Sequence, residues 1–207
     1  MFKLSHISAA CALALAGIAV PAQAQISGDV IRIGFITDMS GLYADIDGPA
    51  GAEMIRQAVA DMGGTVAGKK VEVLVADHQN KADVAAAKAR EWFDQQGLDM
   101  LIGGTNSGTA LAMAKVAAEK KKPFLAVGPG SSALTNDQCS PYTVHYAYDT
   151  VAMAKTTGPA VVKSGGKSWY FMTADYAFGT ALQTDATNVV KASGGTVVGA
   201  VRHPLAT

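Results

Sequence analysis

The sequence has few cysteines, no excess of charge of either sign and no apolar run long enough to span a bilayer. Its two cysteines, Cys11 and Cys139, exclude a disulfide framework. The 17 basic residues balance the 17 acidic ones without forming a basic stripe, which argues against a nucleic-acid or anionic-membrane partner. No G-x-G-x-x-G opens the first expected helix and no G-x-x-x-x-G-K-[ST] occurs, so the common nucleotide-binding signatures are missing.

Residues 1–24 are predicted to be a secretory signal peptide. Lys3 gives a positive start, and an apolar run from Ala9 to Val20 follows. The triplet Ala22-Gln23-Ala24 fits a small-x-small cleavage site, with the cut before Gln25. The run is too short for a membrane anchor, and Cys11 lacks the leucine that precedes a lipidated cysteine. We therefore expect an exported chain.

Cys139 is the only cysteine that remains after this cleavage. A lone cysteine in an oxidising compartment needs an explanation. We expect either a free buried thiol or a thiol whose partner lies outside this chain.

The rest of the chain alternates apolar strands with amphipathic helices. Strands are expected at 29–39, 69–79, 100–102, 123–128, 142–148, 167–175 and 196–203, and helices at 48–64, 81–97, 109–120, 149–166 and 177–195. This order predicts an α/β fold with a parallel sheet and helices on both of its faces.

The helical periodicity also predicts which helix faces are buried. In the first helix the repeat is Met54, Ala58 and Met62; in the second it is Ala85, Ala89, Trp92, Phe93 and Gln96; in the last it is Phe178, Leu182, Ala186, Val189 and Val190. Core packing is the expected role of the last stripe.

The strands divide unevenly along the chain. We expect an N-terminal α/β lobe over 28–148 and a second lobe over 149–207. Two parallel strands and two helices bury little core, so we expect the second lobe to be incomplete and the chain to be a fragment.

Three strand-to-helix turns have the composition of a ligand site. The turn after the first strand carries Ser40 and Tyr43, a second turn spans 103–109, and a third spans 128–132. Ligands bind at the carboxyl ends of parallel strands, where helix N-termini offer unpaired N–H groups and a partial positive charge. The second turn therefore predicts an anion site at Ser107. The alternative is that Asn106 or Ser107 only caps the following helix.

Enzyme patterns are weak. "GTNSG" misses the G-x-S-x-G nucleophile elbow, because Thr105 stands at the first glycine position. No histidine is obviously paired with Ser107, although an exported serine hydrolase remains an alternative. The three histidines after the signal peptide lack metal-ligand spacing with one another or with Cys139, so neither a metal nor a cofactor is expected. His78 is expected to be a solvated or hydrogen-bonded loop residue.

An ordered series of segments resembles the leucine-type periplasmic solute-binding proteins of ABC transporters. The resemblance covers 28–207 and rests on IRIGFITDMSG, GAEMIRQAVADMGG, VEVLVADHQNKADVAAAKAREW, LIGGTNSGTALAMAKVAAEKKKPFLAV and DYAFG. It implies a type I periplasmic binding protein fold, with two doubly wound parallel-sheet lobes that close over a small solute. It also implies a monomeric, non-enzymatic protein of the periplasm that delivers its solute to a permease in the inner membrane. Family chains are nearly twice as long.

The same resemblance implies a set of ligand-binding residues. Ser107 matches a hydroxyl that binds the ligand carboxylate, and Gly128 matches a position whose backbone meets the ligand. Phe178 matches the aromatic that the second lobe lays over the ligand, and Tyr43 lies in a loop that often adds another. Gly130 stands where leucine-binding members often carry Thr or Ser, which puts recognition of an α-amino acid in doubt.

The solute class stays open at this stage, between an amino acid, an aromatic acid and urea or an amide. The ligand-sensing domain of a receptor, which shares the fold, is the alternative function.

Overall fold

The computed structural model describes residues 26–205, so the expected signal peptide and its cleavage site before Gln25 lie outside the described residues. Within them, no helix has the length and apolarity that crossing a membrane requires. The elements are β1 (Val30–Thr37), α2 (Ala44–Asp47), α3 (Pro49–Asp61), β2 (Thr65–Val66), β3 (Lys69–Asp77), α4 (Ala82–Gln95), β4 (Met100–Gly103), α5 (Ser107–Lys120), β5 (Phe124–Ala126), the 3-10 turn η1 (Ser132–Leu134), β6 (Thr143–His145), α6 (Thr150–Lys163), β7 (Ser168–Ala174), α7 (Ala177–Ala192) and β8 (Thr196–His203).

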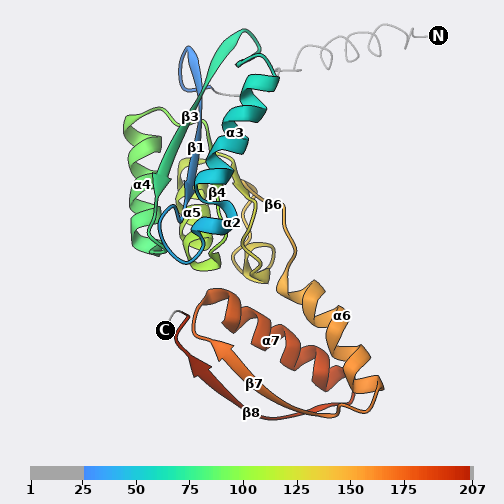
Figure 1. Ribbon diagram of the computed structural model, residues 1–207. Helices are drawn as coiled ribbons and strands as arrows, with labels where there is room; N and C mark the ends of the chain where they lie inside the picture. Colours follow the sequence, from blue (N-terminus) through green and yellow to red (C-terminus); the bar gives the residue numbers. More distant parts are fainter. Residues whose placement is uncertain (1–25, 206–207) are drawn as a thin grey trace, which may run out of the picture.

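The elements gather into two units, one above the other in Figure 1. The first unit holds β1 to β6 and the second holds α6 to β8. The first sheet has the order β2-β3-β1-β4-β5-β6, and every pairing in it is parallel except that of the short β2 with β3. The expected parallel α/β architecture is therefore confirmed.

The strand order reverses at β1. Among the parallel strands, β3 comes next after β1 in the chain and lies on one side of it. The following strand, β4, lies on the other side of β1. In open parallel sheets such a switch point leaves a crevice at the carboxyl ends of the two strands. The turns after β1 and β4 meet there.

Alternating side chains build two hydrophobic layers on the first sheet. Ile36 and Leu101 pack with α4 and α5, whereas their neighbours Phe35 and Ile102 pack on the opposite face, with Ala52 of α3. Gly34 interrupts β1 because a Cβ there would stand 2.7 Å from the Trp92 ring of α4. The glycine thus permits the close approach of helix and strand.

The buried face of α3 differs from the expected one. Met54 is 69% exposed and Met62 is 70% exposed. The helix instead buries Ala52 and packs Ile55 against the sheet. The methionine repeat was the wrong face because two adjacent stripes of α3 are apolar, and periodicity alone does not choose between them.

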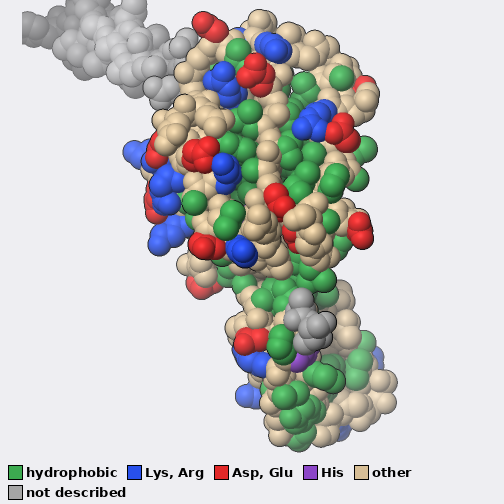
Figure 2. All heavy atoms as spheres, turned by 60° about the vertical axis from the view of Figure 1, so that its left-hand side comes forward, with side chains coloured by type: hydrophobic (Ala, Val, Ile, Leu, Met, Phe, Trp, Pro, Cys, Tyr) green, Lys and Arg blue, Asp and Glu red, His purple; other side chains and the backbone are tan. Residues whose placement is uncertain are grey.

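The second unit is a two-stranded parallel sheet, β7-β8, with α6 and α7 on one side. Val190 of the expected α7 stripe is fully buried, whereas the rest of that stripe is only partly covered. Large apolar side chains are exposed on the two strands, namely Tyr170, Met172, Val198 and Val201. Figure 2 shows hydrophobic side chains gathered on this lower unit.

Asp185 of α7 ties the second unit back to the first. Its Oδ2 accepts a hydrogen bond from Thr150 Oγ1 at 2.6 Å and another from Ser132 Oγ at 2.8 Å. The Ser132 N–H donates in turn to Thr150 Oγ1 at 3.1 Å. Thr150 follows directly on the crossing between the units and is fully buried. Ser132, Thr150 and Asp185 are thus each hydrogen-bonded to the other two at the joint between the units.

Cys139 is exposed, and it has no disulfide partner within residues 26–205. The expectation of a buried thiol was therefore wrong. The residue lies in the loop between η1 and β6, which runs along the surface.

Candidate ligand-binding site

The turn after β4 leaves backbone donors unpaired. Asn106 is the N-cap of α5, and its side chain accepts from the N–H groups of Gly108 and Thr109 at 2.7 and 3.2 Å. The three preceding N–H groups that lead into the helix, those of residues 105–107, have no acceptor within residues 26–205. Such a row of donors at a helix N-terminus favours an anion.

The paired glycines before this turn are needed for packing. A Cβ on Gly103 would lie 2.5 Å from the Phe124 ring, and one on Gly104 would lie 2.0 Å from Thr37 Oγ1 and 2.5 Å from Asp47 Oδ2. The end of β4 therefore touches its neighbours directly. This close packing brings the α5 N-terminus to the switch point.

Ser107 joins two of the predicted turns. It is 1% exposed, and its Oγ accepts a hydrogen bond from the Ser131 N–H at 3.2 Å. A hydroxyl that accepts in this way still has its proton to donate. Because Asn106 makes the side-chain cap, capping does not account for Ser107.

The turn after β5 contributes Gly128 and Gly130. A Cβ on Gly128 would lie 3.0 Å from the Thr105 Cα, so this turn lies against the one before α5. A Cβ on Gly130 would lie 2.6 Å from the Tyr148 ring and 2.8 Å from the Phe178 ring. Two predicted residues, Gly130 and Phe178, are thus in contact although they belong to different units.

The N-terminus of α7 lies against that of α5. The Ala177 Cβ lies 3.9 Å from the position that a Cβ on Gly108 would take. Phe178 packs with Tyr148 at 6.5 Å between ring centroids and 85° between planes, and with Tyr176 at 5.9 Å and 41°. Two helix N-termini and three aromatic rings therefore converge between the units.

Tyr43 also reaches the second unit. Burial raises the pKa of its hydroxyl, and a hydrogen bond with the Tyr176 hydroxyl raises it further. Asp38 holds the loop that carries it, since its two carboxylate oxygens accept from the N–H groups of Gly41 and Tyr43 at 2.9 and 3.0 Å. Tyr43 is therefore neutral and lies close to Tyr176 and Tyr148.

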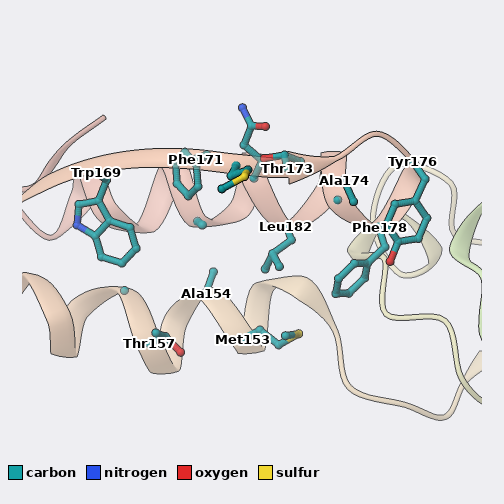
Figure 3. A pocket seen from close by; sticks show the side chains of 15 residues that line it. Met153, Ala154, Thr157, Trp169, Phe171, Thr173, Ala174, Tyr176, Phe178 and Leu182 are labelled. Carbon is teal, nitrogen blue, oxygen red and sulfur yellow. The ribbon is translucent and has the colours of Figure 1, made fainter. Parts of the chain in front are cut away.

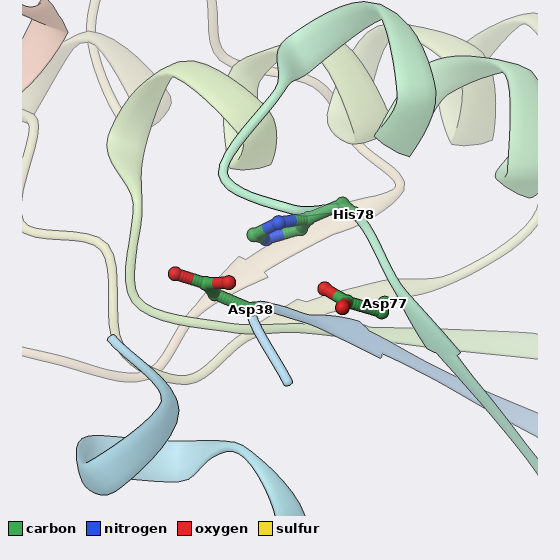
Figure 4. Close-up of side chains that lie close together, drawn as sticks. All are labelled: Asp38, Asp77 and His78. Carbon is green, nitrogen blue, oxygen red and sulfur yellow. The ribbon is translucent and has the colours of Figure 1, made fainter. Parts of the chain in front are cut away.

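Asp38, Asp77 and His78 form the one cluster among the described residues with metal-ligand types close together (Figure 4). Asp77 accepts from the Met39 N–H at 3.0 Å and from Ser40 Oγ at 2.6 Å. These bonds outweigh the effect of burial, so the pKa of Asp77 is lowered. Its carboxylate, like that of Asp38, thus has the role of fastening the first turn.

His78 argues against a metal at this cluster. Its Nδ1 accepts the Asn80 N–H at 3.0 Å, so the proton of the neutral ring is on Nε2. Burial lowers the pKa of His78, an effect only partly opposed by the neighbouring carboxylates. A metal at Nε2 would require an imidazolate. His78 is 1% exposed, so the expected hydrogen bond exists but the solvated alternative was wrong.

Two cavities among the described residues border this region. One of about 370 Å³ lies between α6, β7 and α7, where Ala154 and Leu182 point into it (Figure 3). The other, of about 530 Å³, lies between the η1 region and α7. Of the predicted ligand residues only Phe178 lines either of them, because most of the first cavity is the uncovered interior of the second unit.

Two aromatic residues of this region were not among the predicted ligand residues. Tyr148 lies in the crossing between the units, and Tyr176 is the N-cap of α7. Tyr176 belongs to the segment DYAFG, whose aromatic residues gave a weak signal. Nothing in the sequence near Tyr148 links it to Gly130.

Comparisons with known proteins agree with this architecture. A family profile described as periplasmic binding protein matches residues 30–207. The chain is 30% identical over 185 residues to the Leu/Ile/Val-binding protein homolog 6 of Brucella abortus, covering 86% of this chain and 45% of that protein. It thus spans about half the length of the curated relatives it matches.

Solved structures give the same result. A periplasmic binding protein from Burkholderia mallei superposes with a TM-score of 0.83 at 67% identity, covering 86% of this chain and 48% of that one. A solute-binding protein of an ABC transporter from Rhodopseudomonas palustris, in complex with 3,4-dihydroxybenzoic acid, has a TM-score of 0.74 at 28% identity, covering 87% and 49%.

The expected fold class, a type I periplasmic binding protein, is thereby confirmed. The match covers nearly all of the described chain, and the resemblance noted in the sequence holds across it. The chain belongs to the periplasmic binding protein family.

Proposed function

We propose that this chain belongs to the extracytoplasmic solute-binding component of an ABC importer and binds a small carboxylate between its two units. The row of unpaired N–H groups at residues 105–107 carries this proposal. It lies at the switch point of the first sheet and opposite the N-terminus of α7, so two helix dipoles favour negative charge at one place.

The proposed binding residues have complementary roles. The N–H groups and the Ser107 hydroxyl bind the carboxylate, and the Gly128 backbone borders it. Phe178 supplies apolar surface from the second unit and Tyr43 supplies it from the first. Within residues 26–205 the Ser107 hydroxyl makes no hydrogen bond with a histidine, so binding without chemistry is the function that this arrangement favours over a serine hydrolase.

The aromatic rings around the site favour an aromatic acid as the solute. Tyr43, Tyr148, Tyr176 and Phe178 come together there, and aromatic rings pack well against one another in offset or edge-on arrangements. The related protein from R. palustris is named as a complex with 3,4-dihydroxybenzoic acid. A branched-chain amino acid is the second candidate, favoured by the name of the Brucella relative.

The biological setting belongs to the same proposal. We propose a division into lobes at 28–148 and 149–207, export by the signal peptide at 1–24, and action in the periplasm as a monomer. An ABC permease in the inner membrane is the proposed partner. The family match supports this setting.

The test is calorimetric titration of the purified protein with benzoate and with leucine. Replacing Ser107 with Ala should weaken binding of the carboxylate roughly ten- to a hundredfold, since one hydrogen bond to a charged group contributes about 1.5–3 kcal/mol. Ser168→Ala, at an exposed serine that starts β7, is the matched control and should bind like the wild type. Thermal unfolding of each variant checks that the fold is intact.

Two outcomes contradict the proposal. If the wild type binds neither benzoate nor leucine, the carboxylate function fails. If Ser107→Ala binds as tightly as the wild type, Ser107 serves only to hold the turn at Ser131.

A further inference from the structure

We propose that Asp185 is a positioning residue of this site, which holds the N-terminus of α7 opposite that of α5. Asp185 follows Ala177, the first residue of α7, by eight positions, or about 12 Å along the helix axis. Its carboxylate therefore acts on binding through the placement of α7 and not through contact with the solute. The inference rests on the proposed carboxylate-binding function and adds a residue on which that function depends.

Asp185 meets two segments that enter the joint between the units from different directions. Ser132 begins the 3-10 turn η1 of the first unit, and Thr150 is the first residue of α6. Their hydroxyls donate to the same carboxylate oxygen, at 2.8 and 2.6 Å. Hydrogen bonds to a charged acceptor are short and directional, so two that converge on one atom define where that atom lies. One point of α7 is thereby fixed relative to the first unit.

The two donors favour this arrangement because they are buried. Ser132 is 7% exposed and Thr150 is fully buried, and a buried donor that loses its acceptor is costly. Beside them, a cavity of about 530 Å³ lies between η1 and α7 and is lined by Ser132 and Asp185. Close packing is incomplete there, so the hydrogen bonds supply the restraint on α7.

The segment of the first unit that contains Ser132 also holds the anion-binding turn. The Ser131 N–H donates to Ser107 Oγ at 3.2 Å, and the next N–H, that of Ser132, donates to Thr150 Oγ1 at 3.1 Å. The segment is therefore bonded to the N-terminus of α5 on one side and to the joint on the other. A carboxylate that fixes α7 against this segment also fixes it against the anion-binding turn.

The N-terminus of α7 is the part whose placement matters for a carboxylate solute. The Ala177 Cβ lies 3.9 Å from the position that a Cβ on Gly108 would take, so the two helix N-termini face the same place. Two helix dipoles favour one anion only where the helix ends converge. If α7 swings away about the joint, the second dipole and the Phe178 ring leave the site. The apparent dissociation constant then rises by the inverse of the fraction that remains competent to bind.

The experiment titrates benzoate into the wild type, Asp185→Ala and Asp185→Asn by calorimetry. Asp185→Ala should weaken binding roughly tenfold, because the competent fraction falls. Asp185→Asn keeps an oxygen that can accept from both hydroxyls and should weaken binding less than about threefold. Val190→Ala is the matched control. Val190 is fully buried on the same helix, so this variant loses stability, but it should bind benzoate like the wild type.

A distance measurement reports the placement of α7 directly. One spin label is attached to Cys139, which is exposed in the first unit, and another to Lys191→Cys, exposed in the last turn of α7. Without solute, the wild type and Val190→Ala should give one narrow distance distribution, and Asp185→Ala should give a broader one. Saturating benzoate should narrow the distribution of Asp185→Ala, because the solute selects the same arrangement of the units.

The outcomes separate this inference from the function it rests on. Weaker binding together with a broader distribution in Asp185→Ala, both largely restored in Asp185→Asn and absent from Val190→Ala, supports it. If Asp185→Ala keeps the affinity or the distance distribution of the wild type, or if Val190→Ala weakens binding equally, the inference is overturned. If the wild type binds neither benzoate nor leucine, the proposed function fails. A broader distribution in Asp185→Ala would then still support the positioning role, and an unchanged one would overturn it.

Discussion

The two units of this protein differ in how completely their sheets are covered. The first has helices packed on both faces, with α4 and α5 on one and α3 on the other. The second has α6 and α7 on one face of β7-β8, exposed Tyr170 and Met172 on its strands, and a cavity of about 370 Å³ among its elements. Parallel sheets are normally buried on both faces.

The two units therefore contribute differently to the binding site: one fixes the position of the anion-binding turns, and the other allows the site to close. The first unit holds the anion-binding turns on the ends of tightly packed strands, where Gly103 and Gly104 leave no space. The second unit contributes Phe178 and Tyr176 from the N-terminus of α7, and this unit is loosely packed. Position is therefore set by the first unit, and closure depends on the second.

The largest expected contrast comes from the same substitution made in each unit. Phe124→Ala, at a fully buried ring of the first core, should reduce the free energy of unfolding by about 3–5 kcal/mol. Phe171→Ala should cost at most about 1.5 kcal/mol, because its ring lines the cavity and has already lost contacts on one side. Urea unfolding of both variants measures the difference. Equal losses would show that the second unit is as well packed as the first.

A smaller effect is expected at the joint between the units. Asp185→Ala removes the acceptor of two buried hydroxyls, those of Thr150 and Ser132, and should destabilise the protein by about 1.5–3 kcal/mol. Thr184→Ala, at an exposed neighbour on the same helix, is the control and should change stability by less than about 0.5 kcal/mol. If the two variants unfold at the same temperature, the network contributes nothing to the joint.

The smallest expected effect is a pH dependence that belongs to His78. Burial lowers its pKa in the folded state, so the unfolded chain binds the proton more readily. Stability should therefore fall as the pH drops below 6.5, the usual value for this group. Asp77 and Glu119 have lowered pKa values, so their contributions are lost below their usual values of 3.8 and 4.5, and the range from pH 7 to pH 5 mainly reports His78.

His78→Gln tests this assignment, because glutamine does not titrate. Its unfolding free energy should change less than that of the wild type between pH 7 and pH 5, whatever its stability at pH 7. Parallel pH profiles for the two proteins would assign the acid sensitivity to other groups.

The sequence predicted the order of the major elements well, because each has several residues of apolar periodicity. It missed α2 and β2, which have four and two residues and show no period. It placed the start of α5 at Thr109, two residues late, because the polar turn residues include the N-cap Asn106. On α3 it chose the wrong apolar stripe, since only packing decides between neighbouring faces.

The candidate site was predicted in part. Its turns follow from the rule that parallel strands share a carboxyl edge, and the structure brings Ser107, Gly128, Gly130 and Phe178 together. Their role in binding stays a prediction. The lack of room for a side chain at Gly130 could not be predicted from the sequence, because it depends on Tyr148 and Phe178, which come from other segments of the chain. The Asp38–Asp77–His78 cluster likewise forms only when β1 pairs with β3.

Amide hydrogen exchange with and without benzoate tests the central claim, that the carboxylate binds between the two helix N-termini. The account predicts slower exchange on adding benzoate at residues 105–107, whose N–H groups are unpaired in the unliganded protein, and at 177–179 of α7. It predicts no change at 153–158 and 169–173, around the cavity of the second unit. Slowing confined to those cavity residues, with 105–107 unaffected, would contradict it.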